Sequence, residues 1–287
     1  MKKFILDLVV AASEHIQTDY MLLKLTTEDG SPLPEMLPGQ FVEVLIENSP
    51  RTFLRRPISI NYVDRVSNQL WLLVHVIGEG TRTMASLVQG DRLNLVFPLG
   101  KGFSIPGDLN SSRSDIGIES KCVSPDTHNE VLSSQNQGPM LLVGGGVGTA
   151  PLLYLGAVLN DAGFEVVFLL GARSASDILQ ADDFLRFGSV YYTTEDGSLG
   201  EKGYVTQHSI LGQKRFSRIY SCGPKPMMMA VASYARKHQI ECEVSLENMM
   251  ACGLGACLCC VEKTTEGHLC VCKEGPVFNI NQLTWQI

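Results

Sequence analysis

The stretch MACGLGACLCC, residues 250 to 260, places several cysteines in one glycine-rich loop. Cys252, Cys257 and Cys260 follow the spacing C-x4-C-x2-C, and Cys272 supplies a fourth thiolate further along the chain. This spacing is typical of a plant-type [2Fe–2S] cluster, in which four thiolates surround two iron atoms. Glycines between the cysteines allow the tight curl that such convergence requires. The loop therefore predicts an iron–sulfur centre.

The same region leaves alternatives open. The spacing selects Cys260 over its neighbour Cys259, but nothing in the spacing selects Cys272 over Cys270. A zinc site is the competing interpretation, although such sites normally use two paired cysteine knuckles and only Cys257 and Cys260 form one here. In a reducing compartment, clustered cysteines favour metal binding over disulfides.

The segment LRRPISI, residues 54 to 60, holds a second set of chemically capable side chains. Arg56 can bind a pyrophosphate through two hydrogen bonds, and Ser59 offers a hydroxyl and a backbone N–H. An ordinary edge strand with surface arginines is the alternative, since proline is tolerated on edges. Further on, Gly80 and Thr81 could begin a helix whose N–H groups receive a phosphate. Together the two segments predict a site for a phosphate-bearing cofactor.

A third motif, VGGGVGTAPLL at residues 143 to 153, has its glycines between a strand-like apolar run and a helical pattern. A dinucleotide phosphate docks at such a turn. The motif is not a standard G-x-G-x-x-G, and a tight turn that needs glycine only for packing is the alternative. The segments EDGSLGEKG (195 to 203) and CGPKPM (222 to 227) come where other strands of the sheet would end, which is where open parallel sheets bind ligands.

The elements that must position these motifs divide the chain into four stretches. Residues 1–104 show short strand patterns separated by glycine and proline turns, which predicts an antiparallel barrel. Residues 105–138 are polar and lack periodicity, which predicts an inserted surface loop or linker. Residues 139–240 alternate apolar strands with helices, which predicts a parallel sheet covered on both faces, and residues 241–287 hold the cysteine loop. The expected fold is β plus α/β.

Composition limits the function classes. The net charge of −7 disfavours sequence-independent nucleic-acid binding, which needs a basic face. No run of about 18 apolar residues is present, so we expect no membrane insertion. Asp7 interrupts the apolar N-terminal run, and the alternation of Phe4, Leu6 and Leu8 favours a first barrel strand over a secretory signal. These features favour a cytoplasmic protein.

Taken together, the motifs resemble the family of electron-transfer subunits of class 1B dihydroorotate dehydrogenase, within the ferredoxin–NADP reductase superfamily. RPIS in a barrel and GGGVGTAPL opening a nucleotide domain are shared across the superfamily. CGP before a helix and a C-terminal C-x4-C-x2-C followed by CKEGPVF complete the pattern, and this order is more specific. The resemblance covers nearly the whole chain apart from residues 107–138.

The resemblance implies roles for particular residues. The implied FAD contacts are Arg56, Pro57, Ile58, Ser59, Leu73, Val74, His75, Gly80 and Thr81. The implied NAD contacts are Gly145, Gly146, Gly148, Cys222, Gly223 and Pro224. The implied cluster ligands are Cys252, Cys257, Cys260 and Cys272, so that Cys272 is preferred to Cys270 by analogy only. No residue is expected to act as a nucleophile or general acid, because the cofactors carry the chemistry.

The resemblance also implies a partner and a function. An FMN-containing catalytic subunit would oxidise dihydroorotate to orotate, a step in the biosynthesis of the pyrimidine UMP, in a heterotetramer with two copies of each subunit. Electrons would pass from FMN through the [2Fe–2S] cluster and FAD to NAD+, because FAD exchanges electrons both in pairs and singly. The alternatives are a related ferredoxin–NADP or sulfide oxidoreductase subunit, and a zinc-stabilised interaction module without catalysis.

Two further questions stay open from the sequence. Arg173, after the second strand of the expected sheet, could meet the 2′-phosphate of NADP or lie in solvent, so NAD and NADP are not distinguished. Met249, Met250 and Leu254 beside the cysteine loop could dock the partner subunit or pack the loop against its own domain.

Overall fold

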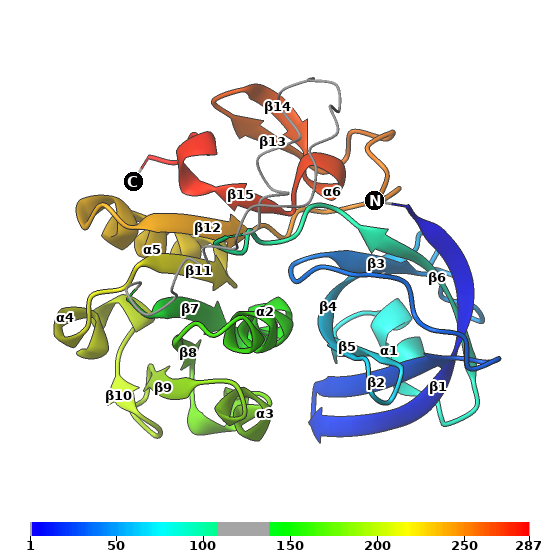
Figure 1. Cartoon of the computed structure of the whole chain (residues 1–287). Coiled ribbons are helices and arrows are strands. Elements are labelled where there is room, and N and C mark those ends of the chain that lie inside the picture. Colours follow the sequence, from blue (N-terminus) through cyan, green and yellow to red (C-terminus); the bar gives the residue numbers. More distant parts are fainter. Residues whose placement is uncertain (1, 108–137, 287) are drawn as a thin grey trace, which may run out of the picture.

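The computed structural model describes residues 2–107 and 138–286. Within these ranges the chain forms a barrel, a sheet flanked by helices, and a C-terminal region that contacts both (Figure 1). Residues 108–137, the greater part of the predicted insertion, lie outside the described residues. Among the residues that are described, no helix has the length and apolar character needed to cross a membrane.

The N-terminal part is a closed antiparallel barrel with strand order β1-β2-β5-β4-β3-β6. Its strands are β1 (Phe4–Gln17), β2 (Tyr20–Thr27), β3 (Phe41–Val44), β4 (Arg56–Asp64), β5 (Gln69–His75) and β6 (Arg92–Leu99). Buried side chains such as Leu8, Leu25 and Leu95 fill its interior, because alternate residues of a barrel strand point inward. The short helix α1 (Glu79–Ala85) follows β5. The predicted antiparallel barrel is confirmed.

Because the barrel is closed, the LRRPISI segment lies in an internal strand and not at an edge. The strand β4 begins at Arg56 and lies between β5 and β3, so the alternative of an ordinary edge strand is wrong. Pro57 pairs in register with Glu43 of β3. A closed barrel has no free edge, so this proline lies in an internal strand. Its ring stiffens the strand at the point where the predicted phosphate site begins.

The second part is a seven-stranded sheet in the order β10-β9-β8-β7-β11-β12-β15. Its strands are β7 (Met140–Gly145), β8 (Val166–Ala172), β9 (Ser189–Thr194), β10 (Glu201–Lys202), β11 (Arg218–Cys222), β12 (Glu241–Ser245) and β15 (Val277–Asn279). Only the last pair, β12 with β15, is antiparallel among these described strands. Helices α2 (Ala150–Asp161) and α3 (Ala181–Leu185) cover the face toward the barrel, and α4 (Ile210–Gln213) and α5 (Lys225–Lys237) cover the other (Figure 1). The predicted helix-covered parallel sheet is confirmed.

The cysteine region is attached to this sheet at both ends. The strand β12 runs in parallel beside β11, so the sheet continues past residue 240 to Ser245. The cysteine loop follows, and then the hairpin of β13 (Val261–Thr264) and β14 (Gly267–Cys270) and the short helix α6 (Val271–Glu274). The chain then returns to the sheet as β15. These two attachments hold the loop in a defined place.

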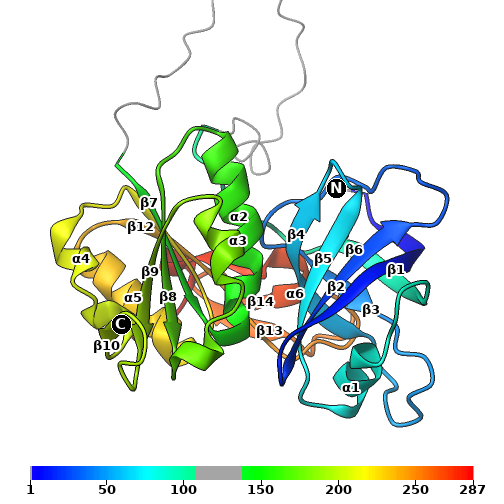
Figure 2. The ribbon, with the colours of Figure 1, turned by 90° about the horizontal axis from the view of Figure 1, so that it is seen from below.

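The barrel and the sheet are joined by buried hydrogen bonds. The side-chain amides of Asn61 in β4 and Gln180 before α3 bond each other in both directions, at 3.0 and 3.1 Å. Asn61 also donates to the carbonyl of Ala150 at the start of α2, at 3.0 Å. Figure 2 shows α2 between the sheet and the barrel. Because a buried amide is costly to leave unpaired, these bonds fix how the two parts lie together.

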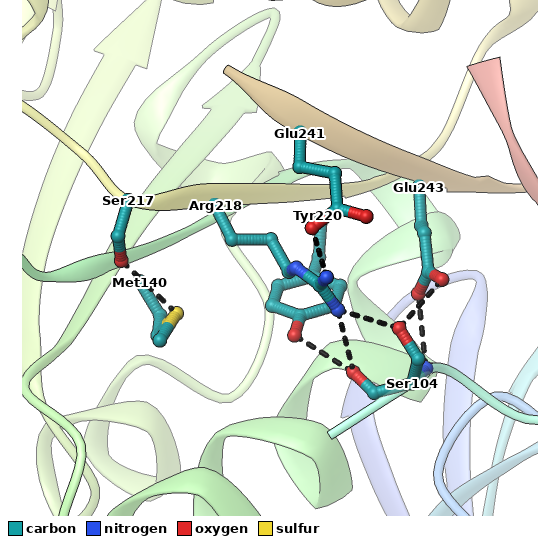
Figure 3. Close-up of polar contacts among 7 residues, drawn as sticks. All are labelled: Ser104, Met140, Ser217, Arg218, Tyr220, Glu241 and Glu243. Carbon is teal, nitrogen blue, oxygen red and sulfur yellow. Dashed lines mark hydrogen bonds and ion pairs between the residues drawn. The ribbon is translucent and has the colours of Figure 1, made fainter. Parts of the chain in front are cut away.

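A second polar network holds the chain that leaves the barrel against the sheet (Figure 3). Glu243 accepts hydrogen bonds from the backbone N–H and the hydroxyl of Ser104, at 3.0 and 2.7 Å. Arg218 donates to the Ser104 hydroxyl at 2.6 Å, and Tyr220 donates to the Ser104 carbonyl at 2.8 Å. Arg218 also forms an ion pair with Glu241. The network lies toward the amino ends of β11 and β12, away from the glycine turns, so it positions the domains rather than a ligand.

Candidate functional site: two adjoining cavities and a cysteine loop

A cavity of about 410 Å³ lies where the barrel, the sheet and the cysteine region meet. Its barrel walls are Phe41, Arg56, Pro57, Ile58, Ser59, Leu73, His75, Ile77 and Thr81. Its other walls are Val147, Ala150, the segment from Ser245 to Met250, and Pro276. The size is ordinary for a cofactor pocket. Most of the residues predicted to contact FAD therefore line one cavity.

One side of this cavity is built by β4 and the first turn of α1. A Cβ at Gly80 would lie 3.2 Å from Nε of Arg56 and 3.1 Å from Cγ2 of Thr52, so glycine permits their close approach. Oγ1 of Thr81 accepts a hydrogen bond from the N–H of Gly78 at 3.0 Å, which fixes the turn. The guanidinium of Arg56 is therefore held beside this turn, where it suits a bidentate pyrophosphate contact.

The strand β5 alternates between the cavity and the barrel core. Leu73 and His75 line the cavity. Val74, between them, is fully buried among the barrel's core side chains. Since neighbouring residues of a strand point to opposite faces, Val74 can reach a ligand in the cavity only through its backbone.

A second cavity, of about 560 Å³, opens at the carboxyl ends of the sheet strands. Of the predicted NAD residues, Gly145, Gly146 and Pro224 line it. This is the part of an open parallel sheet where ligands bind. The two cavities adjoin, because Val147, directly after Gly146, lines the first cavity, as does Ala150 at the start of α2.

The remaining predicted NAD residues bring the two turns together. A Cβ at Gly148 would lie 2.4 Å from the Cα of Gly223, so the backbones of the two turns are in direct contact. A Cβ at Gly145 would lie 2.7 Å from the sulfur of Met227. The side chain of Cys222 is fully buried, and burial raises the pKa of its thiol. Glycine is thus needed here for packing of the turns, in addition to any contact with a ligand.

The sequence motifs did not identify several cavity residues. Asp177, Glu195 and Tyr204 line the second cavity together with Arg173. Glu247 lines the first. Glu195 directly follows the strand β9. An acidic residue in this position is the sequence signal that could have identified it, because such carboxylates bind the ribose hydroxyls of NAD.

In the cysteine loop, backbone N–H groups point at sulfur atoms. Sγ of Cys252 accepts hydrogen bonds from the N–H groups of Leu254 and Ala256, at 3.4 Å each. The bond from Leu254 is the main cause that lowers the pKa of Cys252 to about 6. Gly253 and Gly255 have φ values of 64° and 81°, which let the loop curl around this sulfur. A lowered pKa favours the thiolate, the form that binds metals.

The four predicted ligands fall into two pairs. Cys252 and Cys257 lie close together, because Cys257 also helps to lower the pKa of Cys252. The N–H of Cys272 donates to Sγ of Cys260 at 3.3 Å, and both of these side chains are buried. Two thiolates for each of two irons is the ligation of a [2Fe–2S] cluster.

The peptide groups of Gly255 distinguish Cys272 from Cys270. The N–H of Gly255 donates to Sγ of Cys272 at 3.1 Å, whereas its carbonyl accepts from the thiol of Cys270 at 3.9 Å. An N–H donor stabilises a thiolate, and a carbonyl stabilises a protonated thiol. Burial, with Cys260 beside it, raises the pKa of Cys272 to about 12, so a thiolate there needs an adjacent cation such as iron.

Known proteins resemble this chain in sequence and in fold. The model of the "Iron-sulfur cluster binding domain of dihydroorotate dehydrogenase B" matches residues 247–284, and that of the "Oxidoreductase NAD-binding domain" matches residues 142–233. A structure from work on the NADH-dependent reduced ferredoxin-NADP oxidoreductase and flavin-based electron bifurcation has a TM-score of 0.76 and 25% identity, and the match covers 97% of this chain and 90% of that one. The ferredoxin reductase in carbazole 1,9a-dioxygenase has a TM-score of 0.57 and 19% identity, and that match covers 83% and 66%.

The fold and the sites define an NAD-linked oxidoreductase with a ferredoxin–NADP reductase-like fold and an iron–sulfur domain, with FAD, NAD and a [2Fe–2S] cluster as cofactors. Relatives named "Dihydroorotate dehydrogenase B (NAD(+)), electron transfer subunit" occur in Fusobacterium nucleatum, 35% identical over 84% of both chains, and in Lysinibacillus sphaericus, 33% identical over 94% of both. The relative in Listeria monocytogenes is 36% identical over 88% of this chain and 90% of its own. The chain belongs to this family of electron transfer subunits, which confirms the predicted family and leaves the zinc module without support.

Proposed function

We propose that the chain passes electrons from an FMN-containing dihydroorotate dehydrogenase catalytic subunit, through its [2Fe–2S] cluster and FAD, to NAD+ in pyrimidine biosynthesis. The observation that carries this proposal is the composition of the 410 Å³ cavity. Arg56 to Ser59 come from the barrel, Val147 from the nucleotide turn, and Met250 from the start of the cysteine loop. A flavin bound there would touch both neighbouring sites, and it is the cofactor that exchanges electrons in pairs with NAD and singly with a cluster.

The proposed roles of the residues follow from this arrangement. Arg56 and the turn at Gly80 and Thr81 bind the FAD pyrophosphate, while Pro57, Ile58, Ser59, Leu73, Val74 and His75 contact the flavin. Gly145, Gly146 and Pro224 contact NAD, while Gly148, Cys222 and Gly223 hold the two turns together. Cys252, Cys257, Cys260 and Cys272 bind the cluster, and the hydrogen bonds of Gly255 support Cys272 over Cys270.

The proposed domain limits are a barrel of residues 1–104, a linker of 105–138, a nucleotide domain from 139 and a cluster region that ends at 287. The pairing of β12 with β11 supports placing the last boundary after Ser245 rather than at 240. The match to the iron–sulfur domain model begins at residue 247, close to this point. A cytoplasmic location remains part of the proposal.

The proposed partner is an FMN-containing catalytic subunit, with two copies of each chain in the complex. Exposed apolar side chains around the cysteine loop support docking at this surface: Met249 is 83% exposed, Leu254 47% and Leu258 64%. Met250, by contrast, packs against the core of its own domain. Of the two neighbouring methionines, Met249 is therefore the one available to a partner.

Co-expression of the chain with a dihydroorotate dehydrogenase catalytic subunit tests this function. The purified complex should contain FAD, FMN, and iron and inorganic sulfide in equal amounts, and should reduce NAD+ when dihydroorotate is added. Dihydroorotate oxidation without NAD+ reduction, in a complex with full cofactor content, would contradict the proposal. The chain purified alone should still reduce ferricyanide with NADH, because that reaction needs only the flavin and nucleotide sites.

A subunit of a ferredoxin-NADP oxidoreductase is the second candidate, and the structural match at a TM-score of 0.76 favours it. The sequence relatives favour the first candidate, because they are 33–36% identical to this chain, whereas the structural match is 25% identical to it. Copurification distinguishes the two, because each candidate requires a different partner.

A further inference from the structure

One wall of the nucleotide cavity does not come from the sheet. Tyr20, the first residue of β2, lines the 560 Å³ cavity together with Gly145, Gly146 and Arg173. The strand β2 belongs to the barrel, so the flavin domain reaches across the domain boundary at this point. No sequence motif marks Tyr20, and it lies far along the chain from the glycine turn.

The ring of Tyr20 is supported from behind by His75. The two residues lie directly opposite each other on β2 and β5. Their rings stack with centroids 4.5 Å apart and an interplanar angle of 12°. His75 lines the 410 Å³ cavity, so the stacked pair forms a partition between the two cavities. Cross-strand aromatic pairs of this kind hold both side chains in place.

The hairpin that carries Tyr20 is also tied to the sheet domain. Nε2 of Gln17 donates a hydrogen bond to the carbonyl of Ile178 at 2.9 Å. Burial, and next the charge of Asp177, raise the pKa of the Tyr20 hydroxyl, which therefore stays protonated at neutral pH. Tyr20 thus faces the loop after β8 from across the domain boundary, while its ring is held from within the barrel by the stack with His75.

We propose that Tyr20 is a dinucleotide-binding residue supplied by the barrel, and that its aromatic ring, backed by His75, is a surface against which the nucleotide packs. A flat aromatic face provides a large contact area with few side-chain rotations to restrict. The stacking partner limits those rotations further before the nucleotide arrives, so less ordering remains for the binding step. This inference rests on the proposed function, because it takes NAD as the occupant of the cavity.

The test compares Tyr20→Ala with Tyr20→Phe in the purified FAD-containing protein. Isothermal titration with NAD+ should show a dissociation constant about tenfold higher for Tyr20→Ala. It should remain within about twofold of the wild-type value for Tyr20→Phe, which keeps the ring. In NADH–ferricyanide assays the KM for NADH should rise in parallel, while kcat changes little. Should Tyr20→Ala lose FAD, Tyr20→Leu serves in its place, because it keeps apolar volume without the flat ring.

Gln17→Ala is the matched control, since it removes the hydrogen bond between the same hairpin and Ile178 but no cavity wall. It should bind NAD+ like the wild type. Equal dissociation constants for Tyr20→Ala and Tyr20→Phe would overturn the proposal, and so would an effect of Gln17→Ala as large as that of Tyr20→Ala. A wild-type protein that binds no NAD+ would instead refute the proposed function.

Discussion

Alanine at Gly148 is expected to separate the two turns that frame the nucleotide cavity. The added Cβ would lie 2.4 Å from Cα and 2.6 Å from N of Gly223. Carbon atoms pack at about 3.5–4.0 Å, so the turns have to move apart by about 1 Å. Both contacts are with backbone, and no flexible side chain can give way. Overpacking of this kind costs about 1–3 kcal/mol.

The displacement should strongly lower the rate at which NADH reduces the flavin, while the free energy of unfolding falls only modestly. A shift of about 1 Å in reacting geometry can lower a rate by about 100-fold. Anaerobic stopped-flow mixing with NADH measures the rate at which the bound flavin is reduced. We expect Gly148→Ala to be about 10- to 100-fold slower, with unchanged FAD and iron content.

Gly212→Ala is the control for this measurement. Gly212 lies in α4, and a Cβ there would meet no atom within 4 Å. This variant should reduce its flavin at the wild-type rate. A wild-type rate in Gly148→Ala as well would refute the idea that contact between the two turns positions NAD.

Three further predictions concern stability and docking. Asn61→Ala leaves the Gln180 amide without its reciprocal partner at the domain junction. The free energy of unfolding measured in urea should therefore fall by about 1–3 kcal/mol. An unchanged midpoint of urea unfolding would contradict this prediction. Burial raises the pKa of Glu43 from 4.5 to about 7, so the folded state holds this proton more tightly than the unfolded state does. The free energy of unfolding should therefore fall as the pH rises from 4.5 to about 7. Glu43→Gln should flatten that part of the pH profile, and an unchanged slope would show that Glu43 is not the cause. Met249→Asp should reduce copurification of the catalytic subunit without loss of iron or FAD, the latter checked because Met249 also borders the FAD cavity. Val66→Asp, at another highly exposed residue, should leave copurification unchanged.

The sequence predicted those features in which the necessary residues lie close together along the chain. The spacing of Cys252, Cys257 and Cys260 brings three sulfurs into one loop, because glycines with positive φ let the backbone curl between them. The alternation of Phe4, Leu6 and Leu8 was sufficient to predict the first barrel strand, which the structure has as β1. In both cases the local backbone geometry follows from neighbouring residues alone.

Features that depend on distant segments could not be predicted in the same way. Tyr20 and Glu247 reach the two cavities only through the way the barrel, the sheet and the cysteine region pack. The preference for Cys272 over Cys270 depends on which side of the Gly255 residue, its N–H or its carbonyl, faces each sulfur. The spacing of cysteines contains no information about that orientation. The contact of Gly148 with Gly223 likewise joins two turns that the sequence separates widely.

Dihydroorotate-dependent reduction of NAD+ by complexes that contain Cys272→Ser or Cys270→Ser tests the central claim most directly. Electrons have to cross the cluster in this assay, whereas NADH–ferricyanide activity needs only the flavin and reports that the rest of the site is intact. We predict that Cys270→Ser keeps the NAD+ reduction rate of the wild type. Cys272→Ser should lose that activity and keep the ferricyanide reaction. Wild-type NAD+ reduction by the Cys272→Ser complex would contradict the account.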